Sequence, residues 1–445
     1  MLSRGLRVSR VSSPEWYNFL QSFGGRTDVD WMVLLQTGWG LFSTIWKRKS
    51  RIYYQISINY GLVPVPIMNT AKRIRKLLSN GLRYRRLKPT GKPHRLEAIS
   101  LEITHRCICR CSMCNIWKIS PQVEDLTLSV WLGLLSSPEL RHLRELDLTG
   151  GEPFMRNDLG KILQGICDLQ PTNFPELRTL AITTNGILTD RVLEVTREII
   201  GPLRDRGIDL VLACGMDAVG DLHDRIRNFH GAWERLRETL SGLYSLRQEH
   251  PNLILGIKTT VVPANAHELE RIADFAEDNG LFTIISPRII TPNRFGNCDR
   301  ESDLLFSPED LETIIHFYEG PRFAWSGHRE ALLGYLRTGR IQKPCSAGFN
   351  TLFVRHNGEV FSCPVLALAL GNIKEQTLGD LFRSPSADGF RKKVGSFTEC
   401  SICTEPGLER IAWPFEGFTL LKVLARAGMK DFNGLIQHTG IEKYL

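Results

Sequence analysis

The sequence predicts an α/β fold: a partial (β/α)6 TIM-like barrel, a small C-terminal α+β domain and a basic N-terminal extension. Three observations support this prediction. Strand-like runs alternate with helical ones between residues 96 and 300, which is typical of a parallel sheet wrapped by helices. A hairpin pattern flanked by cysteines follows residue 340, and residues 31–96 carry fourteen Lys or Arg without any Asp or Glu. We expect domains at residues 1–95, 96–300 and 301–445.

Composition narrows the class of protein. Hydrophobic residues make up 42% of the chain, which suffices for a buried core. The eleven cysteines are odd in number and clustered, and we find no N-terminal secretory pattern. These features argue against a disulfide framework and favour metal ligation in a reducing cytoplasm. The net charge of +8 belongs to the N-terminal region, because residues 97–445 sum to about −7.

The N-terminal region suggests several kinds of partner. The apolar segment Trp31–Trp46 falls short of the roughly 20 residues that cross a bilayer, and a basic cluster follows it at residues 47–51. With the second basic run at residues 72–95, it suits peripheral contact with the inner face of a membrane. The same charge would attract nucleic acid or an acidic partner. A solvated basic helical hairpin packed on the barrel is the structural alternative.

The barrel is predicted from six strand–helix units, which leave it open on one side. The candidate strands are Leu96–Thr104, Leu143–Thr149, Leu177–Thr183, Asp209–Ala213, Ile254–Val261 and Phe282–Pro287. The helical stretches between them include Leu159–Gln170, Asp190–Ile200, Trp233–His250 and Ala266–Asn279. In such barrels, chemistry gathers at the carboxyl ends of the strands.

Three thiols follow the first strand with the spacing C-x3-C-x2-C: Cys107, Cys111 and Cys114. Soft sulfur ligands suit iron–sulfur clusters and zinc. A structural zinc site usually takes four ligands as two separated pairs, so zinc would need distant cysteines to complete it. Three thiolates on a cubane of four irons instead leave one iron open. Cys109 fits no ligand position in this pattern.

With this triplet after the first strand, the chain resembles the radical S-adenosylmethionine (SAM) family. The resemblance implies that Cys107, Cys111 and Cys114 hold a [4Fe–4S] cluster whose open iron binds SAM. It also implies reductive cleavage of SAM to a 5′-deoxyadenosyl radical, which takes a hydrogen atom from the substrate. An electron donor such as flavodoxin or ferredoxin would be a partner.

Two further strand ends resemble SAM-binding segments of this family. Gly150, Gly151, Glu152 and Pro153 follow the second strand. The glycines allow close approach of the backbone to a ligand, and Glu152 is a candidate to orient the SAM amino group. After the third strand, Thr184 and Asn185 stand where relatives carry a T-N-G segment near the cofactor. Read alone, each segment is a common turn.

The fourth strand end departs from the family pattern. Relatives often read S-x-D-G, whereas Gly215 takes the serine position here and Ala218 the glycine position, which removes one hydroxyl donor. Asp217 remains a hydrogen-bond acceptor, and Arg227 is a candidate to pair with a carboxylate. An ion pair of Asp224 with Arg227 at a solvated helix start is the plainer interpretation.

The C-terminal region combines a hairpin with four cysteines. After a linker at Pro287–Pro308, Asn357-Gly358 joins two alternating runs, which predicts a hairpin. Its flanking thiols and a later C-x2-C pair form the set Cys345, Cys363, Cys400 and Cys403. By chemistry alone this set also fits a zinc ribbon. The stretch resembles the twitch form of the SPASM domain, which implies one auxiliary [4Fe–4S] cluster. A further helix is expected at Leu420–Ala427, ended by Gly428.

The expected function is hydrogen abstraction from a small or lipid-linked substrate, with dehydrogenation one outcome. A cluster whose irons are all ligated by protein suits electron transfer, and twitch-bearing dehydrogenases are similar in this respect. A peptide-modifying maturase is an alternative. From another class, a zinc-stabilised, basic nucleic-acid-binding protein without catalysis would show the same cysteines and charge.

Overall fold

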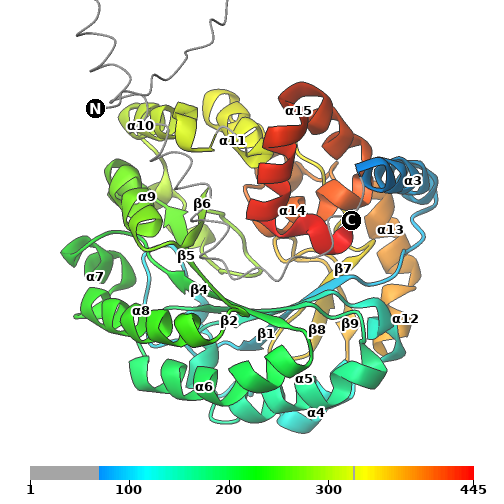
Figure 1. Cartoon of the computed structure of the whole chain (residues 1–445), viewed down its shortest axis with the longest axis horizontal. Coiled ribbons are helices and arrows are strands. Elements are labelled where there is room, and N and C mark those ends of the chain that lie inside the picture. Colours follow the sequence, from blue (N-terminus) through cyan, green and yellow to red (C-terminus); the bar gives the residue numbers. More distant parts are fainter. Residues whose placement is uncertain (1–69, 324–325) are drawn as a thin grey trace, which may run out of the picture. The chain divides into compact units, whose positions relative to one another are not determined.

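The computed structural model describes residues 70–323 and 326–445, and a nine-stranded sheet forms its centre (Figure 1). Six strands run parallel to their neighbours in chain order. They are β1 (Ala98–Thr104), β2 (Glu145–Gly150), β3 (Thr179–Thr184), β4 (Asp209–Gly215), β5 (Leu253–Val261) and β6 (Phe282–Pro287). This arrangement confirms the predicted fold class, a partial barrel of parallel strands.

Helices cover the outer face of these strands (Figure 1). They are α4 (Leu128–Leu135), α5 (Leu159–Asn173), α6 (Thr189–Asp205), α7 (Asp221–Arg227), α8 (Ala232–Glu249) and α9 (Leu269–Asp278). The strand side chains alternate between two environments, as side chains on a pleated sheet do. Leu101 and Leu148, which are register partners, lie in the apolar core, whereas their neighbours Ser100 and Asp147 face the other way and hydrogen-bond to each other. The inner face is therefore polar near β1 and β2.

The C-terminal hairpin continues the same sheet. Strand β7 (Thr351–Val354) pairs in parallel with β1, and β8 (Glu359–Phe361) and β9 (Ala369–Asn372) follow in antiparallel order. The full order is β6-β5-β4-β3-β2-β1-β7-β8-β9. Gly358 has φ +94° at the predicted hairpin turn, where a residue with a Cβ would be strained. The predicted hairpin thus forms, and backbone hydrogen bonds join it directly to the barrel.

The remaining helices lie mainly after β6 (Figure 1). They are α10 (Pro308–Glu319), α11 (Gly327–Thr338), α12 (Leu378–Phe382), α13 (Pro385–Lys393), α14 (Pro406–Glu416) and α15 (Phe418–Thr439), and α3 (Thr70–Thr90) precedes β1. The predicted helix end at Gly428 is wrong. Helix α15 continues to Thr439, and Gly440 at φ +60° ends it, because a left-handed residue stops a helix whereas an internal glycine only weakens it.

Helix α3 contains part of the basic extension and packs against α13, α14 and α15. Its Leu77 is fully buried, and Tyr84 meets the rings of Phe349 and Phe415 edge-on. This packing agrees with the structural alternative for residues 72–95. The apolar segment Trp31–Trp46 and the basic cluster at residues 47–51 lie outside the described residues. No helix in the described ranges is long and apolar enough to cross a membrane.

Candidate active site

The loop that carries the first three thiols leaves β1 and is held from two sides. On one side, the amides of Arg110 and Ser112 donate to the carbonyls of Arg227 and Ile226, at the end of α7. On the other side, the Gly151 amide donates to the Thr104 carbonyl at 2.8 Å. These main-chain bonds fix the loop at the carboxyl ends of β1, β2 and β4, where the predicted chemistry belongs.

The two glycines after β2 are required by this contact. A Cβ at Gly150, which has φ +138°, would lie 2.1 Å from the Thr104 carbonyl oxygen, and one at Gly151 would lie 2.2 Å from that of Arg106. The Glu152 amide donates to the same Arg106 carbonyl at 2.7 Å. The glycines therefore allow close approach to the cysteine loop, whereas the sequence prediction concerned approach to a ligand.

The first thiol set gathers in one place. Cys107, Cys109 and Cys111 belong to one buried cluster with Ile187 and Phe229. Hydrogen bonding with Cys109 lowers the pKa of Cys111 to about 7, although burial opposes this, and the Arg227 guanidinium adds to the lowering. Burial, together with the nearby thiols of Cys111 and Cys107, raises the pKa of Cys114 to about 12.

Glu152 links the second and third strand ends rather than facing outward. Its side chain is fully buried and accepts hydrogen bonds from the Thr184 hydroxyl at 2.9 Å and from the backbone N–H of Asn185 at 2.6 Å. A third bond comes from the amide of Phe154. Pro153 begins the short 3-10 turn that contains Phe154, and it is buried. Burial raises the pKa of Glu152 to about 7. The side-chain nitrogen of Asn185 is buried without a hydrogen-bond partner, so it is the group at this strand end that is free for a ligand.

Asp217 and Arg227 form a buried ion pair beside the thiols. Their Oδ2 and Nη2 atoms are 2.8 Å apart, and the Asp217 side chain is 1% exposed. Arg227 Nη1 also lies 3.9 Å from Cys111 Sγ. Asp224, by contrast, accepts from the amides of Gly231 and Trp233, so the simple Asp224–Arg227 ion pair weighed from the sequence does not form.

The second thiol set comes together from three segments of the C-terminal region. Cys363 is buried, and Cys345 and Cys403 pack around it. Burial raises the pKa of Cys345 to about 12, with further contributions from Cys403 and Cys400. Burial likewise raises the pKa of Cys363, and Cys345 and Cys403 add to this effect. The four predicted thiols therefore lie close enough to affect one another's ionisation.

The sequence interpretation missed a group of charged side chains that influence one another's ionisation, here called the inner-face cluster: Asp147, Lys258, Arg294 and Glu405. Arg294 bonds the Thr149 hydroxyl at 3.4 Å and lies 3.8 Å from Glu405. Burial lowers the pKa of Lys258 and raises that of Asp147. Burial opposes ionisation of Glu405, but Lys258, Arg294 and Lys343 together lower its pKa. For Asp147 and Lys258 the available signal was a polar residue at an alternate position of a predicted strand; Arg294 and Glu405 lie outside the strands and had no such signal.

The thiols could hold a zinc ion or an iron–sulfur cluster, and the two centres differ in the sulfur spacing that they require. A tetrahedral zinc ion with Zn–S bonds of about 2.3 Å holds its sulfurs about 3.8 Å apart. In the described ranges, one group of three His, Cys, Asp or Glu ligand atoms lies within 4.8 Å of one another, and it contains no cysteine. A cubane places each thiolate on a different iron, so its thiolate sulfurs lie farther apart than those around one zinc ion. All eleven cysteines are free thiols, as such ligation requires.

A parallel partial barrel with three thiols after its first strand and four more beside the attached hairpin defines a class of iron–sulfur enzyme. Comparison with known families agrees: residues 101–276 match the model of the radical SAM superfamily, and residues 345–405 match the SPASM iron–sulfur cluster-binding domain. The chain belongs to the radical SAM superfamily and carries a SPASM-type domain. It is a radical-mediated modifying enzyme, and these domains imply a [4Fe–4S] cluster with SAM and an auxiliary cluster. The alternative of a non-catalytic zinc-stabilised protein is therefore wrong.

Several curated proteins are similar to this chain. AdoMet-dependent heme synthase of Methanosarcina barkeri is 28% identical, over 66% of this chain and 83% of its own length. PqqA peptide cyclase of Methylocella silvestris is 23% identical, over 68% and 78%. The sporulation killing factor maturation protein SkfB of Bacillus subtilis is 21% identical, over 63% of each chain. Among solved structures, Streptococcus suis SuiB bound to S-adenosylmethionine aligns with TM-score 0.50 and 14% identity over 78% of this chain and 79% of its own, which supports the fold.

Proposed function

We propose that this enzyme dehydrogenates a small or lipid-linked substrate that carries an anionic group, and that it binds this substrate at the inner-face cluster. The observation that carries the proposal is the position of Arg294. It contacts Thr149, which precedes the Gly150 segment, and Glu405, which lies two residues after Cys403. We infer that Arg294 and Lys258 donate hydrogen bonds to the anionic group of the substrate, in a cluster whose charge Asp147 and Glu405 balance.

In this proposal Cys107, Cys111 and Cys114 hold the cluster that binds SAM, and Cys345, Cys363, Cys400 and Cys403 hold the auxiliary cluster. When bound, these groups supply the radical that removes a hydrogen atom and an acceptor for the electron left on the substrate. The chain's own residues orient and shield the reactants. Asn185, Asp217 and Arg227 line the cofactor side, and Gly150 to Pro153 support the cysteine loop.

The test is anaerobic reconstitution followed by iron, sulfide and product analysis. Two cubanes give about eight irons and eight sulfides per chain. With dithionite and SAM we expect 5′-deoxyadenosine. Cys111→Ala should lose this product and about half of the iron, whereas the matched variant Cys109→Ala should keep its iron. Stoichiometric zinc without labile sulfide, or nucleoside release by Cys111→Ala, would refute the proposal.

Peptide modification is the second candidate, because two of the similar proteins are a peptide cyclase and a maturation protein. The same assay separates the candidates. Candidate substrates are chosen from the functions of the neighbouring genes. Short peptides and anionic metabolites are then compared for their ability to raise the rate of SAM cleavage above the rate without substrate. Stimulation by a peptide alone would replace the dehydrogenation proposal.

We also propose peripheral contact with an anionic membrane through one face of α3. Leu78 and Leu82 are 44% and 53% exposed, and Arg75 and Arg86 are exposed at helical spacing beside them. The opposite face of the helix is buried against the C-terminal helices. Residues 31–96 contain no acidic residue, so anionic lipid is the complementary partner.

Flotation with vesicles tests this contact. The protein should float with vesicles containing phosphatidylglycerol at low salt, float less as salt rises, and fail to float with phosphatidylcholine alone. The double variant Leu78→Ser/Leu82→Ser should float several-fold less. Its control is Leu305→Ser/Leu368→Ser, which changes two exposed leucines elsewhere (59% and 48% exposed). Equal flotation of both double variants would exclude this face.

A further inference from the structure

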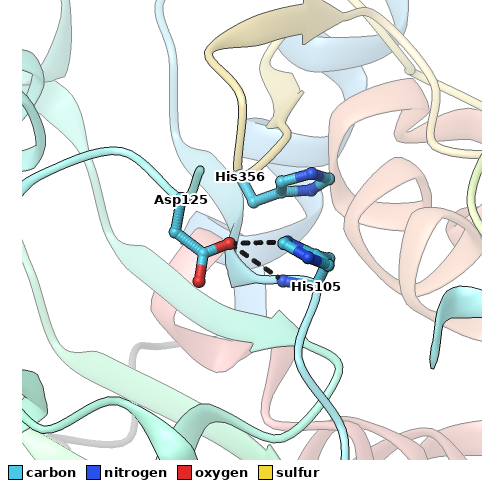
Figure 2. A group of neighbouring side chains, drawn as sticks. All are labelled: His105, Asp125 and His356. Carbon is cyan, nitrogen blue, oxygen red and sulfur yellow. Dashed lines mark hydrogen bonds and ion pairs between the residues drawn. The ribbon is translucent and has the colours of Figure 1, made fainter. Parts of the chain in front are cut away.

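A group of buried side chains that the proposed chemistry does not use lies at the ends of β1 and β7 (Figure 2). It contains His105, Asp125 and His356, whose side chains are 2%, 12% and 3% exposed. One ligand atom from each residue lies within 4.8 Å of the other two, and no other such group occurs in residues 70–323 and 326–445. The imidazole rings are 4.5 Å apart, centroid to centroid.

Both rings are oriented by carboxylates. Asp125 Oδ1 is 2.9 Å from His105 Nδ1, and Glu102 Oε1 is 2.6 Å from His356 Nδ1. The Nε2 atoms of both histidines are buried without a hydrogen-bond partner. A buried polar atom left unsatisfied costs on the order of 1–3 kcal/mol. The unsatisfied Nε2 of His356, on a ring whose Nδ1 is already held by Glu102, points to a ligand that binds imidazole nitrogen.

From these contacts we propose that His105, Asp125 and His356 bind one divalent transition-metal ion, of which zinc is the representative. Glu102 holds His356 Nδ1, as carboxylates hold metal-binding histidines, so that Nε2 is presented to the ion. His105 Nδ1 and Asp125 Oδ1 hydrogen-bond at 2.9 Å, and on binding one tetrahedral ion with bonds of about 2.0–2.2 Å they would separate to about 3.4 Å.

The donor set favours zinc or a similar ion over magnesium or calcium, because two of its three ligands are imidazoles. It also differs in kind from the thiol sets. The ion would join the end of β1, the loop before α4 and the turn between β7 and β8. It would thereby add a clamp between the barrel and the hairpin.

The test is metal analysis of the intact protein, reconstituted with its clusters, supplied with zinc and desalted. We expect about one zinc per chain in addition to iron. His356→Ala and Asp125→Asn should lose zinc while keeping iron and sulfide, and the exposed control His230→Ala should keep both. Zinc should raise the midpoint of thermal unfolding of the wild type but not of His356→Ala.

X-ray absorption at the zinc edge separates this site from zinc at cysteines. Nitrogen and oxygen neighbours at about 2.0–2.1 Å support the proposal, whereas a sulfur shell near 2.3 Å overturns it. Wild-type protein without zinc, or equal zinc in wild type and His356→Ala, also overturns it. If one of the two variants fails to fold, the other variant and the zinc-edge spectrum of the wild type still show whether zinc binds at this site.

Discussion

The structure explains why residue 215 is glycine, although relatives often carry serine at this position. The sequence indicates a lost serine hydroxyl at this position. In the structure, a Cβ at residue 215 would lie 2.3 Å from Arg227 Nη2, so the guanidinium occupies the space of the missing side chain. Arg227 in turn pairs with Asp217 and approaches Cys111. A charged donor from α7 therefore stands where relatives place a neutral one from β4.

Replacing Arg227 with methionine should be costly, because Asp217 would be left buried without the guanidinium that now opposes the rise in its pKa. Loss of one member of a buried ion pair typically costs about 3–5 kcal/mol. Denaturant unfolding should reveal this loss, whereas Arg225→Met, on the exposed side of the same helix, should change stability by less than about 0.5 kcal/mol. Similar unfolding midpoints for the two variants would contradict the assigned pairing.

Most of the site residues are recognisable from sequence, but several of their partners are not. The cysteine spacing and the Gly-Gly-Glu-Pro segment point to the correct strand ends because these motifs are local. The bonds from Glu152 to Thr184 and Asn185, and the inner-face cluster, depend on side chains that meet across distant strands. No local pattern specifies which of those polar residues will meet.

At the scale of elements, the contact between α3 and α15 depends on small residues. A Cβ on Gly81 would lie 2.5 Å from the ring of Phe418, near its root, where the ring cannot swing aside freely. Gly417, at φ +64°, similarly leaves no room for a Cβ beside the Leu77 carbonyl. The basic extension is therefore attached to the C-terminal helices by close backbone approach.

Gly81→Ala should destabilise the protein by about 1–3 kcal/mol through overpacking. The matched variant Gly133→Ala, on α4, has open space around the new Cβ and should instead stabilise by about 0.5–1 kcal/mol through helix propensity. Thermal unfolding of both variants measures the difference. Shifts of the same sign would show that the helix contact is looser than described.

The six parallel strands and four of their helices follow from hydrophobic periodicity, which is strong where a strand or a helix face is buried. Helices α10 and α11 were not predicted, although Ser307 and Asp310 form a capping box at the start of α10. The pairing of β7 with β1 was also beyond sequence reasoning, because the two strands are some 250 residues apart and alternation does not identify a partner.

At the scale of the whole molecule, segments next to strands of one continuous sheet carry the first thiol set and two thiols of the second, Cys345 and Cys363. If the auxiliary cluster serves as electron acceptor, it should be removable without loss of SAM cleavage. Cys403→Ala should therefore retain about four irons per chain and still release 5′-deoxyadenosine with dithionite. Cys298→Ala, which changes an exposed thiol, should retain about eight. Abolished nucleoside release in Cys403→Ala alone would assign the second thiol set a different role.

Strand β1 hydrogen-bonds to β2 on one edge and to β7 on the other. If both clusters are bound, the register of β1 with β7 therefore helps to set the distance between the segments that hold them.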